Sequence, residues 1–377
     1  MNVAFVTDKD PFDVHAWSGS IYHVYDTLCN TGINVTAVGT LANRYRPLNL
    51  IKKLLYLSMG AKYHWYRDRF VVRSFGAQLE RRLESIDHDI IFSPGTVPIA
   101  YLRSEKPIVI WTDATFGQMV DFYPDFTGLA RETVTQGQEV ERSALSKCQL
   151  AIYTSDWAAR SAQDDYGVIR KRIGVVPFGA NVATTYTESE IASFIEQRIG
   201  SICKLLFIGV DWRRKGGELA VEIVRSLNER SIESELHIVG CQAPGGLPGY
   251  VKSHGFVSKK GDLERKFLDE LYRTATFFVL PTQADCVPVV LAEASAYGLP
   301  LLSTAVGGVS SVVEDKVNGR TFPLTESASG YCDYIVSLLN SPDSYRKASF
   351  AALHRYQKKL NWKAAGKKMR ELLAELV

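Results

Sequence analysis

The stretch PTQADCVPVVLAEASAYGLP, residues 281–300, follows directly on the short apolar run ATFFVL at 275–280. The apolar run indicates a buried strand, and Pro288 favours the first turn of a helix, where a missing amide hydrogen removes no hydrogen bond. Asp285, Cys286 and Val287 then occupy the loop between strand and helix. A strand, a polar loop and a helix in this order are typical of a parallel α/β sheet.

The same alternation of apolar runs and helical patterns extends along the whole chain and predicts two parallel sheets. Strands are expected at 3–7, 33–39, 89–93, 107–112, 150–154 and 173–178, and again at 204–210, 234–240, 275–280, 299–304 and 319–324. Helices are expected near 20–30, 74–85, 132–147, 155–165, 215–229, 262–274, 288–298 and 326–340, and two more after 342. The pattern breaks at 179–203, which predicts a domain boundary there. A chain of 377 residues is also longer than a single core usually supports.

Composition excludes several classes of protein. The six cysteines form no CxxC pair, which favours reduced, buried thiols in the cytosol. No apolar run is long enough to cross a bilayer, and residues 1–7 do not resemble a signal peptide, so we expect a cytoplasmic protein. The chain has neither a G-x-G-x-x-G motif nor a P-loop, which argues against dinucleotide oxidoreductases and P-loop NTPases.

Ligands of doubly wound sheets bind beyond the carboxyl ends of the strands, where helix N-termini present free amides. The helix that starts at Pro288 can therefore receive an anion, and Glu293, about one and a half turns into it, can accept hydrogen bonds from ribose hydroxyls. The alternative stays open that Asp285 caps this helix and that Glu293 is solvated.

A second loop carries positive charge. In FIGVDWRRKGGELAVEIV (207–224), Arg213, Arg214 and Lys215 directly precede the two glycines at the start of an amphipathic helix. Cations at a helix N-terminus oppose the helix dipole, which suggests that an anion belongs there and favours a diphosphate. A solvated basic turn is the alternative.

Taken together, these stretches resemble family 4 retaining glycosyltransferases, which have the GT-B fold of two Rossmann-like doubly wound domains facing a cleft. Their donor motif has an acidic residue followed eight positions later by Glu and Ala, then Gly, Pro and a Gly-Gly pair. The matching positions are Asp285, Glu293, Ala294, Gly298, Pro300, Gly307 and Gly308, with Lys215 and Gly216 in the basic loop. The resemblance spans nearly the whole chain.

The resemblance implies an acceptor domain at 1–185, a donor domain at 186–355 and a helix at 356–377 that returns to the first domain. It further implies that Lys215 and Arg214 hold the diphosphate of a nucleotide-sugar and that Glu293 binds the ribose. Asp285 would contact the sugar hydroxyls. The full set implied for donor binding is Gly19, Arg213, Arg214, Lys215, Asp285, Cys286, Val287, Pro288, Val289 and Glu293.

Three features depart from the family pattern. After the acidic residue, Val287-Pro288 replaces the Phe-Gly that is common in the family. Asp285 stands where Glu is usual, and Val210 stands where an Arg usually follows the strand glycine, so that Arg214 or Arg213 must substitute. In the N-terminal half, AWSGSIYHV (16–24) places Gly19 at a helix start, where its amide can face a ligand. Asp113 in WTDATF (111–116) follows a strand and is our candidate for positioning acceptor or sugar; a capping or turn role is the alternative.

The implied activity is transfer of a hexose from a nucleotide diphosphate sugar to a glycan, lipid-linked or small-molecule acceptor in surface polysaccharide or glycoconjugate synthesis. Catalysis would depend on Asp113, Asp285, Lys215 and Arg214, with no metal and no cofactor besides the donor. Two alternatives remain: a nucleotide-sugar epimerase on the same fold, and a non-catalytic glycosyltransferase-like binding subunit.

Positive charge is concentrated in one segment. Residues 41–82 contain ten Lys and Arg against two acidic residues, although the net charge of the whole chain is only +3. Within it, RYRPLNLIKKLLYLSMGAKYHWYRDRF (44–70) interleaves cations with Leu, Tyr and Trp, which predicts either an element bound peripherally to an anionic membrane or a helix packed on its own domain with a solvated basic face. No nucleic-acid-binding motif accompanies the charge, so nucleic acid is not an expected partner.

Overall fold

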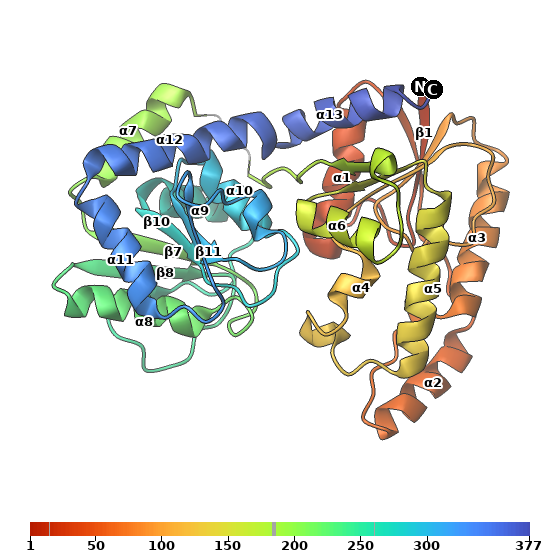
Figure 1. Cartoon of the computed structure of the whole chain (residues 1–377), viewed down its shortest axis with the longest axis horizontal. Coiled ribbons are helices and arrows are strands. Elements are labelled where there is room, and N and C mark those ends of the chain that lie inside the picture. Colours follow the sequence, from red (N-terminus) through yellow and green to blue (C-terminus); the bar gives the residue numbers. More distant parts are fainter. Residues whose placement is uncertain (15, 183–185, 260) are drawn as a thin grey trace. The chain divides into compact units, whose positions relative to one another are not determined.

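The computed structural model describes residues 1–14, 16–182, 186–259 and 261–377. The chain forms two compact units, Met1–Phe178 with Trp362–Val377, and Gly179–Asn361. Each unit is a parallel six-stranded sheet with helices on both faces (Figure 1), as the sequence predicts.

Unit 1 has the strand order β2-β1-β3-β4-β5-β6, with every neighbouring pair parallel. Its strands are β1 (Asn2–Val6), β2 (Asn34–Val38), β3 (Ile90–Ser93), β4 (Ile108–Thr112), β5 (Leu150–Tyr153) and β6 (Ile173–Val175). Its helices are α1 (Ser20–Cys29), α2 (Arg46–Ser58), α3 (Arg69–Leu83), α4 (Phe116–Met119), α5 (Arg131–Lys147), α6 (Asp156–Asp164) and α13 (Trp362–Ala374). Buried side chains of α13 join the core between α1 and the sheet, so the last helix of the chain completes unit 1.

Unit 2 repeats the plan in the order β12-β11-β10-β7-β8-β9, again all parallel. Its strands are β7 (Cys203–Ile208), β8 (Ser234–Val239), β9 (Val251–Ser253), β10 (Phe277–Leu280), β11 (Leu301–Thr304) and β12 (Gly319–Phe322). Its helices are α7 (Glu188–Arg198), α8 (Gly217–Glu229), α9 (Asp262–Thr274), α10 (Val289–Ala296), α11 (Ala328–Leu339) and α12 (Pro342–Lys359). The central strands are buried along their length, which is why they read as continuous apolar runs.

The unit boundaries differ from those expected at 185/186 and 355/356. The first lies after Phe178, because its ring packs on Trp111 in the core of unit 1. Residue 185 itself lies outside the described residues. The last lies after Asn361, because Leu360 is buried in the core of unit 2 and its carbonyl accepts a hydrogen bond from the amide of Ala180.

Local signals explain several element ends. Ser155 caps α6 by accepting a hydrogen bond from the amide of Ala158, as the sequence predicts. Helix α3 begins five residues before the expected residue 74, because Asp68 provides an N-cap that accepts from the amide of Phe70. Helix α7 and strand β9 were not expected; β9 has only three residues, two of them exposed.

A buried arginine links the ends of two helices in unit 2. Arg198 is 2% exposed, and its guanidinium donates to the carbonyls of Tyr272, Arg273, Tyr297 and Gly298. These carbonyls lie at the C-termini of α9 and α10, where the negative end of each helix dipole stabilises a cation. Arg198 thereby fixes the helices that carry Tyr272 and Glu293.

Candidate functional site

Two loops meet at the carboxyl edge of the unit 2 sheet, because β7 and β10 are neighbouring parallel strands. Gly216 precedes α8 with φ of 81°, and a Cβ built on it would lie 2.0 Å from the carbonyl oxygen of Pro281. The amide of Gln283 donates to the carbonyl of Arg214 at 2.7 Å. The basic loop and the loop after β10 are therefore joined backbone to backbone.

This contact brings three of the predicted site residues together. The Lys215 ammonium lies 2.5 Å from a carboxylate oxygen of Asp285, and the Thr282 hydroxyl donates to the same oxygen at 3.0 Å. The Arg214 guanidinium lies 3.7 Å from that oxygen and donates to the carbonyl of Ala284 at 2.8 Å. Lys215 and Asp285 are only 8% and 6% exposed, so the pair is largely withdrawn from water.

Burial sets the electrostatics of this pair. Burial lowers the pKa of the Lys215 ammonium, and the nearby Arg214 cation adds to that effect, whereas the Asp285 carboxylate opposes it. A buried ion pair contributes little net stability, but removing one partner costs about 3–5 kcal/mol, because the other charge is left without compensation. An anion that reached Lys215 would have to offer at least as good a partner as Asp285.

Glu293 belongs to a second group of contacts, on α10. Its carboxylate is 1% exposed, forms an ion pair with Lys259, and accepts a hydrogen bond of 2.8 Å from the hydroxyl of Tyr272. No interaction recorded among the described residues joins Glu293 to Lys215. The alternative that Glu293 is solvated is wrong. A ribose at this carboxylate would have to displace Lys259, whose side chain is 42% exposed.

Lys259 and Tyr272 were not among the predicted site residues. Lys259 lies in the connection between β9 and α9, and Tyr272 lies near the end of α9, so neither has a fixed spacing to Glu293. Burial and the Glu293 carboxylate raise the pKa of Tyr272, which keeps its hydroxyl protonated as a donor.

Four of the remaining predicted donor residues, Cys286, Val287, Pro288 and Val289, lie at the start of α10. Helix α10 begins at Val289, one residue later than expected, with Pro288 as its N-cap, and no side chain caps the helix. The alternative that Asp285 caps α10 is therefore wrong. Val289 opens the helix, whose first amides have no acceptor within it. Cys286 is buried, Val287 is partly buried and Arg213 is exposed.

Gly19 and Asp113 lie in unit 1. Gly19 precedes α1 with φ of 82°, and Asp113 directly follows β4 and is partly buried. Thr115, not Asp113, caps α4 by accepting from the amide of Gln118. At the same edge of the sheet, Asp8 follows β1, and burial raises the pKa of its carboxyl group. Asp8 was not among the predicted site residues, although it directly follows the strand expected at 3–7, as Asp113 follows the strand expected at 107–112.

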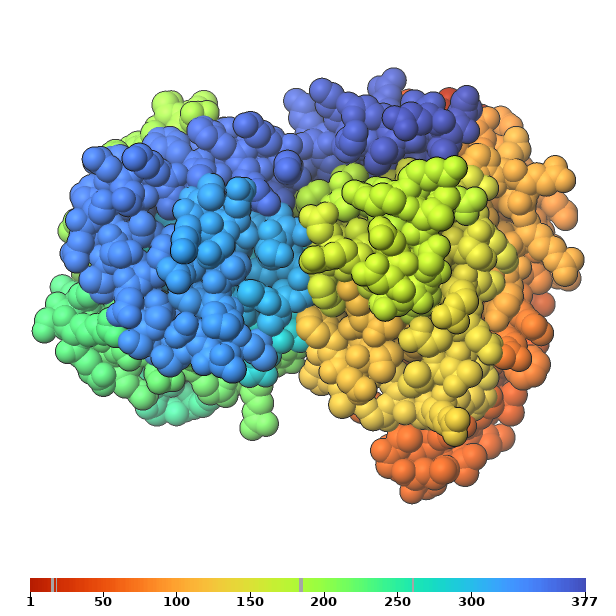
Figure 2. Space-filling model, viewed as in Figure 1, coloured from red at the N-terminus to blue at the C-terminus, as the bar shows by residue number. Residues whose placement is uncertain are grey.

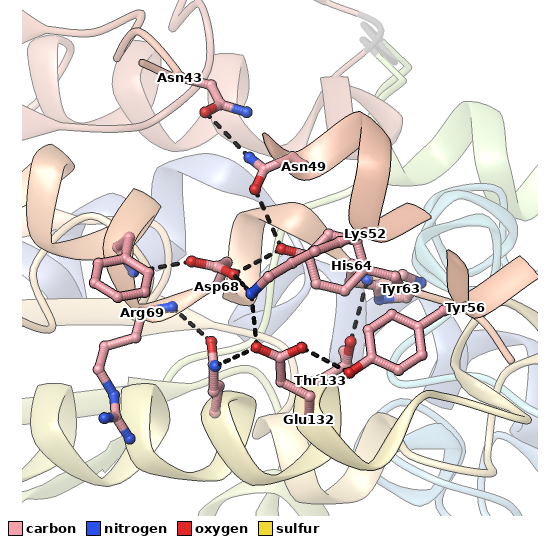
Figure 3. Close-up of polar contacts among 12 residues, drawn as sticks. Asn43, Asn49, Lys52, Tyr56, Tyr63, His64, Asp68, Arg69, Glu132 and Thr133 are labelled. Carbon is pink, nitrogen blue, oxygen red and sulfur yellow. Dashed lines mark hydrogen bonds and ion pairs between the residues drawn. The ribbon is translucent and has the colours of Figure 1, made fainter. Parts of the chain in front are cut away.

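A third group of polar contacts attaches α2 to unit 1 (Figure 3). The Lys52 ammonium lies 2.8 Å from Asp68 and 2.7 Å from Glu132. The Tyr56 hydroxyl donates to Glu132, and the Tyr63 hydroxyl donates to Asp68, both at 2.7 Å.

Burial acts to lower the pKa of Lys52, but these hydrogen bonds raise it above its ordinary value. The pKa values of both carboxyl groups are lowered: burial opposes the shift, but the hydrogen bonds from Lys52 and the tyrosines outweigh it. The network therefore stays charged at neutral pH.

The opposite side of α2 faces away from the protein. Asn49 is the only buried residue of the helix, whereas its apolar side chains are exposed. The exposed apolar residues in and next to α2 are Leu48, Leu50, Ile51, Leu54, Leu55, Leu57 and Met59. Figure 2 shows the segment, in orange, protruding from unit 1. The expectation of a helix packed on its own domain with a solvated basic face is wrong, because α2 attaches by polar groups and exposes its apolar face.

Neither a membrane-spanning helix nor a cluster of metal-ligating side chains is present among the described residues. Among the helices of these residues, none is both long and apolar enough to cross a bilayer. Within the same ranges, no three His, Cys, Asp or Glu side chains are placed to share a metal ion.

The segment that contains the unit 2 site matches a described protein family. Residues 203–341, which contain Lys215, Lys259, Tyr272, Asp285 and Glu293, match the profile of the family described as glycosyl transferases group 1. A D-inositol 3-phosphate glycosyltransferase of Nocardiopsis dassonvillei is 28% identical over 195 residues, which are 48% of this chain and 45% of the relative. The chain spans about half the length of the curated relatives it matches.

Solved structures resemble the whole chain. Sucrose-phosphate synthase from Thermosynechococcus elongatus has a TM-score of 0.68 at 16% identity, covering 100% of this chain and 99% of that one. HepE from Anabaena, solved in complex with UDP, has a TM-score of 0.65 at 14% identity, and each chain is covered completely. These similarities confirm the predicted GT-B fold.

The close approach at Gly216 leads to a prediction. In Gly216→Ala, the methyl group would collide with the Pro281 carbonyl and the residue would keep a strained positive φ, so we expect a loss of roughly 2–5 kcal/mol in the stability of unit 2. Native-state hydrogen exchange of the β7 amides measures this loss. Gly249→Ala is the matched control, since nothing lies within 4 Å of a Cβ at that position. Equal protection in the two variants would contradict the packing argument.

Proposed function

We propose that this protein is a glycosyltransferase that moves a hexose from a nucleotide diphosphate sugar to a glycan, lipid-linked or small-molecule acceptor in surface polysaccharide or glycoconjugate synthesis. The observation that carries the proposal is the buried group of Lys215, Arg214 and Asp285 at the start of α10, inside the segment that matches the glycosyltransferase profile. The named relatives support it, and so does the solved UDP complex of a protein with the same fold.

Donor binding would replace the ion pair between Lys215 and Asp285 by contacts between the diphosphate and the two cations. A diphosphate brings two or more negative charges to Lys215, Arg214 and the amides that open α10, and so can replace the single charge of Asp285. Asp285, released from Lys215, would then be able to accept hydrogen bonds from the sugar hydroxyls. Glu293 would bind the ribose after Lys259 moves aside.

The same groups would stabilise the departing diphosphate. Cleavage of the bond between the anomeric carbon and phosphate builds negative charge on the leaving group, and preorganised cations and amides stabilise it best where water is excluded. We assign this role to Lys215, Arg214 and the N-terminus of α10. Asp113 would position the acceptor or the reacting sugar, and Gly19 would offer its amide to the donor.

The finer assignment is to family 4, with retention of anomeric configuration and no metal. It is supported by the matching motif residues, of which Asp285 is the departure from the usual Glu. Two alternatives make different predictions: an epimerase would convert the nucleotide-sugar without an acceptor, and a non-catalytic subunit would bind the donor and transfer nothing.

Nucleotide binding is the first test. In a thermal-shift screen with UDP, GDP, ADP and their sugars, we expect one nucleotide to stabilise the wild type by roughly 2.7 kcal/mol at a concentration of a hundred times Kd. Lys215→Ala should lose most of that shift relative to its own ligand-free Tm, because the diphosphate loses its buried cation. Lys252→Ala removes an exposed lysine of unit 2 and should keep the full shift. If no nucleotide raises the Tm of the wild type, donor binding is excluded.

Stereochemistry and metal dependence form the second test. With the donor found in that screen and an acceptor extract, we expect the first-formed product to have the same anomeric configuration as the donor, as proton NMR of the linkage would show. The initial rate should be unchanged in EDTA, because Lys215, Arg214 and α10 supply the positive field. An inverted product, or a rate that is lost in EDTA and restored by Mg²⁺ or Mn²⁺, would overturn the finer assignment.

We further propose that the protein acts at the cytoplasmic face of a membrane and binds anionic lipid through residues 44–70. The exposed apolar face of α2 supports this, since insertion into a bilayer would remove it from water, and exposed Arg44, Arg46 and Lys53 would meet anionic headgroups.

Vesicle binding tests the membrane proposal. Leu54→Gln/Leu57→Gln makes two exposed positions of α2 polar, and we expect at least a tenfold weaker partition onto phosphatidylglycerol vesicles, because each leucine contributes about 1.5–3 kcal/mol when fully buried. Leu263→Gln/Leu324→Gln, at equally exposed positions of unit 2, should bind like the wild type. Identical co-sedimentation of the two double variants would argue against insertion of α2.

A further inference from the structure

A cavity of about 320 Å³ lies between the chain that enters α2 and the outer face of α3. It is lined by Arg44, Tyr45, Phe70, Arg73, Ser74, Ala77, Gln78 and Arg81. None of these residues belongs to the set predicted to bind the donor. The volume is at the lower end of the range of small-molecule sites, about 300–1,000 Å³.

The spacing along α3 accounts for the cavity. Arg73, Ala77 and Arg81 are four residues apart and therefore lie on one stripe of the helix, with the two arginines roughly 12 Å apart along its axis. The small side chain of Ala77 between them leaves the space open. The rings of Tyr45 and Phe70, with centroids 6.1 Å apart, contribute an apolar wall.

Charge in the cavity is not neutralised. No acidic residue lines it, and within the described ranges neither Arg44 nor Arg81 has an ion pair. Arg73 lies over the ring of Tyr101 at 5.2 Å. Three other cations of the same basic segment are paired: Lys52 with Asp68 and Glu132, Arg67 with Glu141, and Arg69 with Glu139. Three guanidinium groups around an open space form a site for a group with several anionic oxygens.

We propose that this cavity binds the phosphate group of an anionic membrane lipid. The inference rests on the membrane part of the proposed function and adds to it a discrete site between α2 and α3. A lipid is favoured over a soluble phosphate because Tyr45 is followed at once by α2, whose exposed apolar face would place the cavity at the level of the headgroups. Arginine binds phosphate bidentately, whereas the aromatic wall suits the glycerol and upper acyl region.

Two variants test the site independently of each other. Arg44→Gln/Arg81→Gln removes two of the guanidinium groups, and Ala77→Phe fills the cavity without changing the charge. Arg160→Gln/Lys171→Gln removes two other exposed cations of unit 1 and is the charge-matched control. The affinity of each full-length protein is measured on vesicles of phosphatidylcholine with and without phosphatidylglycerol, by co-sedimentation.

We expect each cavity variant to bind phosphatidylglycerol vesicles at least tenfold more weakly than the wild type, and the control to bind within a factor of about three. If Ala77→Phe binds like the wild type and both charge variants lose affinity equally, attraction is diffuse; the cavity proposal fails and membrane binding stands. A different result would identify a soluble ligand. In that case the wild type does not bind vesicles but binds inorganic phosphate or glycerol phosphate saturably, and Ala77→Phe abolishes the phosphate binding. The lipid assignment would then be overturned. Nucleotide binding and sugar transfer are measured separately, so none of these results decides whether the protein is a glycosyltransferase.

Discussion

The close contact between the start of α8 and the loop after β10 is the constraint on which the candidate site depends. A Cβ at residue 216 would overlap the carbonyl oxygen of Pro281, so only glycine allows the two loops to meet. Their meeting places Lys215 beside Asp285, although 70 residues separate them in the chain. Arg198 supports the arrangement from the other end of α10, since it binds the carbonyls that close that helix.

Each carboxylate of the unit 2 site has a lysine partner: Asp285 pairs with Lys215, and Glu293 pairs with Lys259. Burying a charge without a partner is costly, and each lysine compensates the charge of the carboxylate that it contacts. A ligand can bind at these pairs only if it supplies a new partner for each charged group whose present partner it displaces. A diphosphate can replace Asp285 at Lys215, and ribose hydroxyls can replace Lys259 at Glu293. A nucleotide diphosphate sugar carries both groups in one molecule.

Helix α2 reverses the usual arrangement of an amphipathic helix. Its attachment to unit 1 is polar, through Lys52 and Tyr56, and its apolar residues face outward. These partly buried hydrogen bonds hold the helix in place without burying its apolar face, which leaves that face available. The arginine-lined cavity adjoins this helix, so apolar and cationic groups of one segment are exposed together.

The sequence by itself determined both sheets, the position of nearly every strand in them and the two loops of the candidate site in unit 2, because buried strands and helix starts leave local patterns. The tertiary structure determined which side chains contact the predicted site residues. Lys259 and Tyr272 reach Glu293 from α9 and the connection before it, and no spacing in the chain encodes that contact. It also decided the direction in which α2 faces. An amphipathic pattern gives the two faces of a helix, but which face packs depends on the groups that Asp68 and Glu132 present from elsewhere in the fold.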